Sequence, residues 1–244
     1  MSEEATISLL GYNIYSDDKE YLAVAKGVIN TINPHSYVIS RKDGKFRKAL
    51  EAADYLLPDG TGITIAARIL AGQKINKIAG SDLHEIVLKS LNKSKGSCFY
   101  LGSSEKTLNL IRERLKREYP DVRTRFFSPP FRDKFSKEEN GTMTKAVNDF
   151  RPDVLFVGMT APKQELWVHE NMENLNVPLI CCIGAVFDFY AGTVKRPGRF
   201  WINAGLEWLP RLLKEPARLW KRNFVSSPLF LWYILKEKFQ RFKD

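Results

Sequence analysis

The chain has 244 residues, of which 44% are hydrophobic, and it carries a net charge of +10. This length fits one domain or one domain with an appendage, and the composition excludes a disordered chain because it supplies enough apolar surface for a core. There is no run of about 18 apolar residues and no basic region followed by an apolar one at the start, so we predict neither a membrane-spanning helix nor a signal peptide.

Short apolar runs that end at Gly, Pro or Asp alternate with helical patterns through most of the chain. In chain order we predict a strand at Ser36–Ser40, a strand at Tyr55–Leu57, helices at Gly62–Leu70 and Asp82–Leu91, a strand at Cys98–Leu101, helices at Glu105–Glu118 and Lys137–Phe150, and strands at Val154–Val157 and Leu179–Ile183. Such alternation predicts an α/β fold with a mostly parallel sheet and helices on both faces. Ligands bind outside the carboxyl ends of such strands, so the residues that follow each strand are the candidate site residues.

The first candidates lie near the start of the chain. Thr31, Asn33 and His35 bring a hydroxyl, an amide and an imidazole close together in sequence. Asp59 follows the strand Tyr55–Leu57 in a Pro-Asp-Gly sequence, which is ordinarily a turn. Because this turn also joins the carboxyl end of a strand to a helix, it is where an α/β enzyme places a catalytic acid or base.

Later strand ends carry glycines followed by polar side chains. Gly102 precedes serines at a helix start, so this loop either presents backbone N–H groups to a phosphate or merely caps the helix. Gly158 opens a polar loop that reaches Gln164, whose amide can both donate to and accept from a base or a sugar. Asp188 follows Gly184 among aromatic residues, where an unpartnered carboxylate is costly to bury, and a helix N-cap is the alternative.

Residues 195–244 differ from the rest of the chain in charge, because they hold twelve Lys or Arg against four Asp or Glu, which is +8 of the net +10. We therefore predict an α/β domain over residues 1–194 and a basic helical appendage over residues 195–244. Its aromatic residues include Trp201, Trp208, Trp220, Phe224, Phe230, Trp232 and Tyr233. Aromatic side chains interleaved with Lys and Arg are typical of a segment that lies on an anionic membrane surface. A packed helix with solvated charges is the alternative, and we expect no nucleic-acid partner.

Two kinds of site find no support in the sequence. The three cysteines lie in or beside apolar runs, where we expect buried thiols, and no Cys/His cluster has metal-ligand spacing. The chain also has no GxGxxG sequence and no P-loop, which disfavours a nicotinamide-binding fold and an NTPase.

A series of motifs occurs in order along the chain. They are Thr31-x-Asn33-Pro34, Leu57-Pro-Asp59-Gly60, Ala79-Gly80-x-Asp82, Leu101-Gly102, Pro152-Asp153 with Val157-Gly158 and Ala161-Pro-Lys-Gln-Glu165, Gly184-Ala-x-Phe-Asp188, and Trp208 with Arg211, Glu215-Pro216 and Arg218. In this combination the chain resembles the WecG/TagA/CpsF family of bacterial glycosyltransferases from about Leu10 to about Arg222. The resemblance implies a Rossmann-like, inverting enzyme on the inner face of the cytoplasmic membrane. Such an enzyme transfers a sugar from a UDP-sugar to a polyprenyl-diphosphate-linked sugar in cell-surface polysaccharide synthesis, without a cofactor or a metal ion.

The same resemblance implies roles for particular residues. Asp59 corresponds to the family's catalytic base, Thr31 to a neighbouring active-site hydroxyl, and Asn33 belongs to the same motif. Gln164 and Asp188 correspond to positions that contact the nucleotide or the sugar.

The cationic positions of the appendage correspond to arginines that close over the diphosphate. Arg211 and Arg218 match two of them, and the third falls on Lys221 or Arg222, a choice that the sequence leaves open. His35 stands where the family has an acidic residue, so we expect it to affect the choice of acceptor. Without a metal ion, these cations are the groups available to neutralise the charge that develops on UDP.

Several alternatives remain open at this level. The chain is either such a transferase, another nucleotide-dependent α/β enzyme, or a non-catalytic adaptor at a membrane surface. The donor sugar is N-acetylmannosamine, its uronic acid, glucose or glucuronic acid. Exposed apolar surface on the α/β domain predicts either a homo-oligomer contact or the docking place of the appendage.

Overall fold

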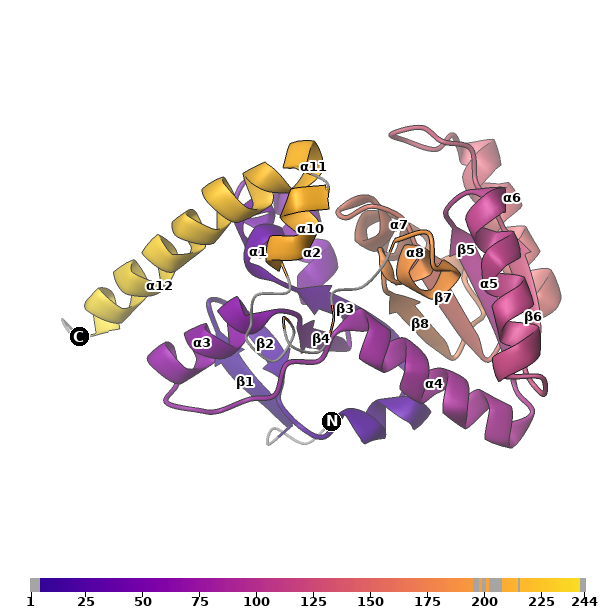
Figure 1. The fold of residues 1–244 in the computed structure, drawn as a ribbon, viewed down its shortest axis with the longest axis horizontal. Helices are drawn as coiled ribbons and strands as arrows, with labels where there is room; N and C mark the ends of the chain where they lie inside the picture. The colour runs from indigo at the N-terminus through magenta and orange to yellow at the C-terminus, as the bar shows by residue number, and fades with distance from the viewer. Residues whose placement is uncertain (1–4, 195–197, 199–200, 202–207, 215, 242–244) are drawn as a thin grey trace.

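The computed structural model of the chain describes residues 5–194, 198, 201, 208–214 and 216–241. Its centre is a parallel sheet of six strands in the order β4-β3-β8-β7-β5-β6 (Figure 1). The strands are β3 (Gly27–Ile32), β4 (Tyr55–Pro58), β5 (Ser97–Gly102), β6 (Arg123–Phe127), β7 (Val154–Gly158) and β8 (Leu179–Cys182). The predicted α/β fold with a parallel, Rossmann-like sheet is confirmed.

Helices pack on both faces of this sheet. The helices of the α/β body are α1 (Pro34–Ser40), α2 (Gly44–Glu51), α3 (Thr61–Leu70), α4 (Gly80–Ser94), α5 (Glu105–Glu118), α6 (Lys137–Phe150), α7 (Lys163–Asn171) and α8 (Val186–Ala191), with short 3-10 turns η2 (Lys19–Val24) and η3 (Met172–Asn174). One buried cluster joins the sheet to α4, α5 and α8, and another joins it to α6 and α7. The helices predicted from sequence fall within α3, α4, α5 and α6, and the three cysteines are buried and free, as expected.

The start of the chain forms a separate hairpin beside the main sheet. Its antiparallel strands are β1 (Thr6–Leu9) and β2 (Tyr12–Tyr15). A third buried cluster joins this hairpin to α1, α2 and α3 and also includes Phe230 and Ile234 from near the end of the chain. The C-terminal segment therefore shares a core with the body.

The predicted strand at Ser36–Ser40 is wrong, because these residues lie in α1. The side chain of Asn33 accepts hydrogen bonds from the backbone N–H groups of His35 and Ser36, and Pro34 occupies the first turn of the helix. An Asn cap followed by Pro favours the start of a helix, and this preference is stronger than the β propensity of the side chains that follow. The strand in this part of the chain is β3, which ends at Ile32, just before the cap. Strand β6 was also missed, because arginines interrupt its apolar pattern at the sheet edge.

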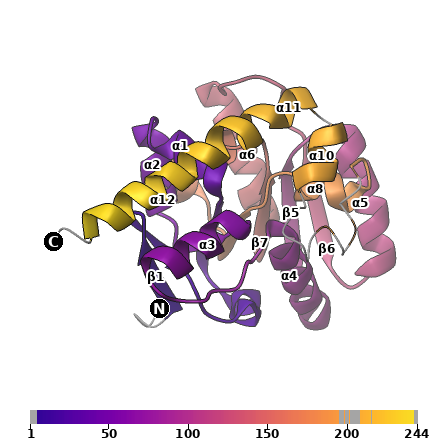
Figure 2. The ribbon, with the colours of Figure 1, turned by 60° about the vertical axis from the view of Figure 1, so that its left-hand side comes forward.

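The C-terminal segment consists of α10 (Trp208–Lys214), α11 (Pro216–Trp220), the π-helical segment η4 (Lys221–Ser226) and α12 (Ser227–Arg241). Helix α12 contacts α1 and α3 and lies across them in Figure 2. Among the residues that the structure describes, no helix is both long and apolar enough to cross a membrane. The predicted domain boundary after residue 194 adjoins residues outside the described part, and it stays a prediction.

Candidate functional site

Asp59 and Asn33 follow neighbouring strands and lie next to each other at the carboxyl edge of the sheet. The backbone N–H of Asp59 donates to the carbonyl of Ile32 at 2.9 Å, which continues the parallel pairing of β3 and β4 into the turn. Gly60 follows with φ of 99°, a conformation that favours glycine. The side chains of Asp59, Asn33 and Thr31 are all partly exposed. The structure therefore places Asp59 beside Asn33, and Thr31 lies two residues before Asn33 in β3.

Asn33 also has a structural task that limits what it can do in the site. Its Oδ1 accepts from the N–H groups of His35 and Ser36 at 3.0 and 3.1 Å, and the Ser36 hydroxyl accepts from the Asn33 N–H at 2.7 Å. This capping box holds the first turn of α1 directly beside Asp59. The amide oxygen of Asn33 is thus occupied, while its NH2 group remains a donor for a ligand.

Gly102 and Gly158 end β5 and β7 and are partners in the parallel register of these strands. A Cβ at Gly102 would lie 2.5 Å from the Gly158 carbonyl oxygen, and a Cβ at Gly158 would lie 2.5 Å from the Phe187 ring. Both glycines are therefore required for close packing at this edge. Ser104 caps α5 by accepting from the Thr107 N–H at 3.2 Å, so helix capping, one of the two sequence interpretations of this loop, is observed.

Gln164 lies in the first turn of α7 and is almost completely buried, with 3% of its surface exposed. Its Oε1 accepts from the backbone N–H of Met159 at 3.2 Å, and its Nε2 donates to Glu165 at 2.8 Å. A Cβ at Gly184, just after β8, would lie 3.5 Å from both amide atoms. The amide of Gln164 is thus held at the carboxyl ends of β7 and β8, where a ligand is expected.

Asp188 lies inside the first turn of α8, so the N-cap interpretation is wrong; Ala185 occupies the cap position. The carboxylate is partly exposed, and the hydroxyl of Thr193 lies 3.1 Å from the Asp188 carbonyl oxygen and 3.4 Å from its Oδ1. Because α8 directly follows β8, Asp188 shares the carboxyl edge of the sheet with Gln164.

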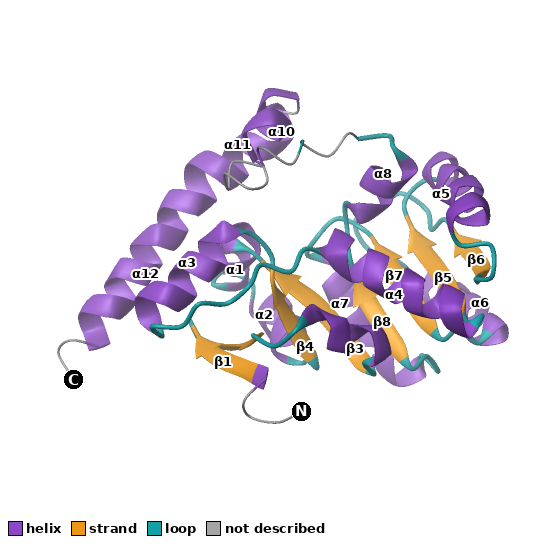
Figure 3. Cartoon of the chain, turned by 60° about the horizontal axis from the view of Figure 1, so that its bottom comes forward, coloured by secondary structure: helices purple, strands orange, loops and turns teal. Residues whose placement is uncertain are grey.

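The C-terminal cations lie in α10, α11 and η4, on the side of the molecule toward which the strand arrowheads point in Figure 3. Arg211 belongs to α10 and Arg218 to α11, but their side chains lie outside the described residues. Lys221 and Arg222 begin η4, where Lys221 is exposed and Arg222 is half-buried. The positions Lys195, Arg196 and Arg199 of the preceding basic loop lie outside the described residues as well.

His35 joins the Asn33 motif to the C-terminal segment, a contact that the sequence does not predict. Its Nδ1 lies 2.8 Å from the Ser226 hydroxyl of η4. Burial, and then the nearby positive charge of Arg222, lower the pKa of His35, so the imidazole is neutral at physiological pH. His35 is therefore not a cation here, and its Nδ1 contacts the C-terminal segment.

A second contact forms where α1, α3 and α12 meet. A Cβ at Gly62 would lie 2.4 Å from the Pro34 ring and 3.6 Å from the Phe230 ring. Phe230 also packs edge-on against Tyr37, with ring centroids 5.3 Å apart. Because α1 begins after Asn33 and α3 begins after Asp59–Gly60, α12 is packed on the two helices that start at the candidate site. The three- and four-residue spacing of Phe230, Tyr233 and Ile234 is the sequence signal that could have found this face.

The comparison with known proteins decides the family. The sequence model of the family described as "Glycosyl transferase WecG/TagA/CpsF family" matches residues 10–244. The chain belongs to this family. The predicted resemblance is confirmed, and the protein is a glycosyltransferase.

Curated relatives agree with this assignment. The glycosyltransferase is 30% identical over 219 residues to the N-acetylglucosaminyldiphosphoundecaprenol N-acetyl-beta-D-mannosaminyltransferase of Bacillus spizizenii, a match that covers 89% of this chain and 82% of the relative. It is 28% identical to the protein of the same name from Bacillus subtilis, over 91% of this chain and 84% of that protein. It is also 27% identical to the protein of this name from Staphylococcus aureus (strain MW2), over 86% of this chain and 80% of that protein.

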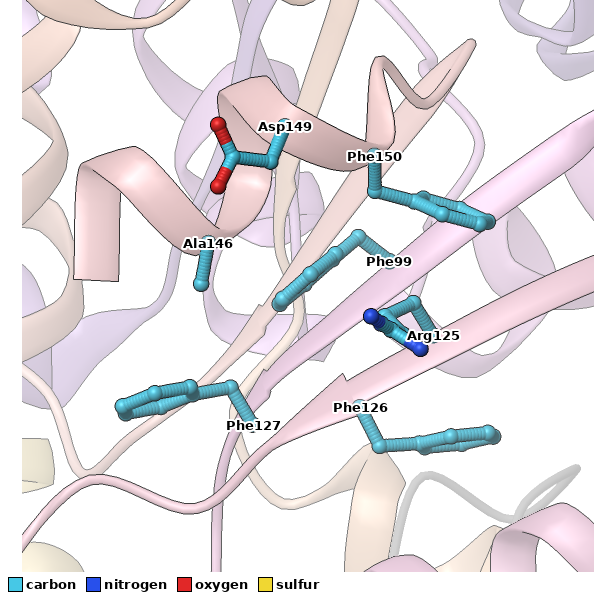
Figure 4. Close-up of a pocket in the computed structure, with 7 residues that line it drawn as sticks. All are labelled: Phe99, Arg125, Phe126, Phe127, Ala146, Asp149 and Phe150. Carbon is cyan, nitrogen blue, oxygen red and sulfur yellow. The ribbon is translucent and has the colours of Figure 1, made fainter. Parts of the chain in front are cut away.

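A cavity of about 440 Å³ in the glycosyltransferase lies away from these residues, between β6 and the end of α6 (Figure 4). It is lined by Phe99, Arg125, Phe126, Phe127, Ala146, Asp149 and Phe150. Strand β6 forms the sheet edge opposite β4, so this cavity is separate from Asp59. Within the described ranges, no group of three or more His, Cys, Asp or Glu side chains is arranged to hold a metal ion.

Proposed function

We propose that this glycosyltransferase transfers an N-acetylmannosamine-type sugar, or a related hexose or uronic acid, from a UDP-sugar to a polyprenyl-diphosphate-linked sugar. The product would belong to a cell-surface polysaccharide. The names of the relatives support both the mannosaminyl donor and the lipid-linked acceptor. The single observation that carries the proposal is the pairing of the Asp59 turn with the end of β3, at the edge of the sheet where ligands bind.

Asp59 is the general base of the proposed reaction. Glycosyl transfer requires the acceptor hydroxyl to lose its proton as it attacks the anomeric carbon, and a carboxylate can take that proton. Attack from the face opposite the leaving UDP inverts the configuration at that carbon. Thr31 and the NH2 group of Asn33 supply neighbouring hydrogen-bonding groups that orient the acceptor.

The UDP-sugar is proposed to bind at the other strand ends of the same edge. The backbone after Gly102 and Gly158 and the side chains of Gln164 and Asp188 lie along it. Asp188 suits a sugar or ribose hydroxyl, because an ionised carboxylate is an acceptor of two or more hydrogen bonds. This arrangement leaves the cationic C-terminal helices to cover the diphosphate.

Arg211, Arg218 and either Lys221 or Arg222 are proposed to neutralise the charge that develops on UDP as it leaves. Guanidinium groups bind phosphate oxygens in pairs, and no metal ion is required for this task. The half-burial of Arg222 next to His35 supports Arg222 as a fixed contact of the body and leaves the exposed Lys221 as the more adaptable cation.

The C-terminal segment is proposed to hold the enzyme on the inner face of the cytoplasmic membrane, where the lipid acceptor lies. Helix α12 exposes Leu231, Trp232, Leu235 and Phe239, and lysines flank them. Such a surface suits the interface of an anionic membrane. Since the segment carries the cations of the site, membrane docking would also complete the site. A homo-oligomer remains a prediction, which sedimentation of the purified protein tests.

The deciding experiment is a panel of UDP-sugars with a short-chain polyprenyl-diphosphate-linked N-acetylglucosamine acceptor, analysed by mass spectrometry. We expect a disaccharide product with wild type, little with Asp59→Asn, and wild-type amounts with Asp121→Asn, an exposed carboxylate. Stabilisation of the protein by NAD but not by UDP would instead favour another nucleotide-dependent enzyme. Vesicle binding without any product and without an effect of Asp59→Asn would favour a non-catalytic adaptor.

A further inference from the structure

Three groups at the carboxyl ends of β7 and β8 form one directed chain of hydrogen bonds. The backbone N–H of Met159 donates to Oε1 of Gln164, and Nε2 of Gln164 donates to Oε1 of Glu165. A backbone N–H can only donate, so the amide oxygen must face Met159 and the amide nitrogen must face Glu165. The orientation of the Gln164 carboxamide is therefore determined by its two partners.

Glu165 is unusual because it is a carboxyl group in the interior. Only 2% of its surface is exposed, and its second oxygen, Oε2, is buried with no hydrogen-bond partner among the described residues. An unsatisfied buried polar atom costs free energy, so a residue needed only to fill this space would be apolar. Burial raises the pKa of Glu165 to about 7, and the hydrogen bond from the Gln164 side chain and a backbone hydrogen bond of Glu165 partly oppose this effect.

The partner that Glu165 holds lies at the ligand-binding edge. The amide atoms of Gln164 lie 3.5 Å from the position of a Cβ at Gly184, and Gly184 has φ of +53°. Gly184 places no side chain against the amide, and among the described residues Nε2 donates to Glu165 alone, which leaves its second N–H for a ligand.

We propose that Glu165 is a positioning residue for the UDP-sugar. Its carboxyl group holds the Gln164 carboxamide in one orientation, so that the remaining N–H of Gln164 meets an acceptor oxygen of the bound nucleotide sugar. This inference rests on the proposed function, because it takes the strand edge next to Gly184 as the donor-sugar site. Glu165 itself acts through Gln164 and does not touch the substrate.

The test compares kinetics and UDP binding in single variants of the full chain. Glu165→Ala lets the amide rotate, so we expect the KM for the UDP-sugar and the Kd for UDP to rise roughly tenfold, the scale of one hydrogen bond, with a smaller change in kcat. Glu165→Gln keeps an oxygen for Nε2 of Gln164 and should restore both constants. The matched control is Asn171→Ala, which removes a buried polar side chain bonded to the Trp167 carbonyl in the same helix.

The outcomes separate this inference from the proposed function. If the wild-type protein does not bind UDP, the proposed function fails. If it does bind UDP, and folded Glu165→Ala binds UDP with the same Kd and KM as Asn171→Ala, Glu165 is not a positioning residue. Should Glu165→Ala fail to fold, Glu165→Asp replaces it, because the shorter side chain withdraws the same carboxyl group from Gln164, and the same rise in KM and Kd is required.

Discussion

The α/β body and the C-terminal segment bury their apolar side chains to very different extents. In the body, β5, β7 and β8 are buried along their whole length between two layers of helices. In residues 208–241, nine large apolar side chains are exposed, against six in the far longer body, counted over the described residues. Helix α12 buries Phe230 and Ile234 on one side and exposes Trp232 and Phe239 on the other. The body thus has a core of its own, whereas the segment depends on the body on one face and leaves an apolar face for another surface.

The contacts between the two regions involve the two helices that start at the candidate site. His35 meets Ser226, and the guanidinium of Arg241 donates to the carbonyl of Leu70 at the far end of α3 at 2.9 Å. The guanidinium of Arg41, just after α1, lies 5.4 Å from the centre of the Tyr233 ring. A shift of the segment therefore acts on α1 and α3, the helices that start at Asn33 and Asp59.

The largest expected effect is on chemistry in the body. Asp59→Asn should lower kcat by about 10²–10⁴-fold, the usual contribution of a general base, with little change in melting temperature. Steady-state rates with the lipid acceptor and thermal unfolding check both halves of this prediction. An unchanged kcat would remove Asp59 from the mechanism.

The next effect concerns the buried face of the C-terminal segment. Phe230→Ala should lower the free energy of unfolding by about 3–5 kcal/mol, because it leaves a cavity among Tyr37, Gly62 and α12. Leu231→Ala is the control, because Leu231 is exposed and its replacement should change the free energy of unfolding by no more than about 0.5 kcal/mol. Denaturant unfolding measures the cost, and hydrogen exchange shows whether protection is lost mainly in α1, α3 and α12. Equal costs for the two variants would contradict this packing.

Glu165 should make the stability of the body depend on pH. Burial raises the pKa of Glu165 in the folded protein from 4.5 to about 7. The contribution of Glu165 to the free energy of unfolding is therefore fully present below pH 4.5, where the carboxyl group is protonated in both states, and it is lost as the pH rises through 7. Between pH 5 and pH 9 the wild type should lose about 2–3 kcal/mol relative to Glu165→Gln. Unfolding free energies at several pH values measure this difference, and parallel curves for the two proteins would show that Glu165 does not titrate in this range.

The exposed face of α12 should matter for membranes and not for folding. The double variant Trp232→Ser, Phe239→Ser should bind anionic lipid vesicles roughly tenfold more weakly, because it removes apolar area available to the interface. The control is Ile65→Ser, Ile69→Ser, which changes two exposed apolar side chains on α3 of the body. Vesicle co-sedimentation and melting temperature are the measurements. A similar loss of binding in both variants would mean that the segment is not the membrane-binding surface.

The smallest effect is expected at the hydrogen bond between the two regions. Ser226→Ala removes the partner of His35 and should cost about 1 kcal/mol. Faster hydrogen exchange confined to η4 and the start of α1 would locate the loss. No change in exchange or stability would mean that this bond does not contribute to docking of the segment.

The sequence was informative wherever the deciding residues are close together along the chain. Apolar runs of three to five residues ended by Gly or Pro mark β4, β5, β7 and β8, because strands buried on both faces have this pattern. The ordered motifs identified the family and pointed to Asp59 and Gln164. Where two local signals compete, the sequence pattern is not enough: the β-prone residues at Ser36–Ser40 predict a strand, although the cap at Asn33 starts a helix.

The amino-acid sequence by itself therefore determined the fold class, the family and the ends of β4, β5, β7 and β8, but not the end of β3. Only the tertiary structure decided that His35 meets Ser226, that Phe230 packs at the starts of α1 and α3, and that Glu165 holds Gln164 next to Gly184. Periodicity and turn residues act over a few positions, so they can be seen in the chain. Contacts between residues nearly two hundred positions apart depend on the path of the whole backbone, which no local pattern contains.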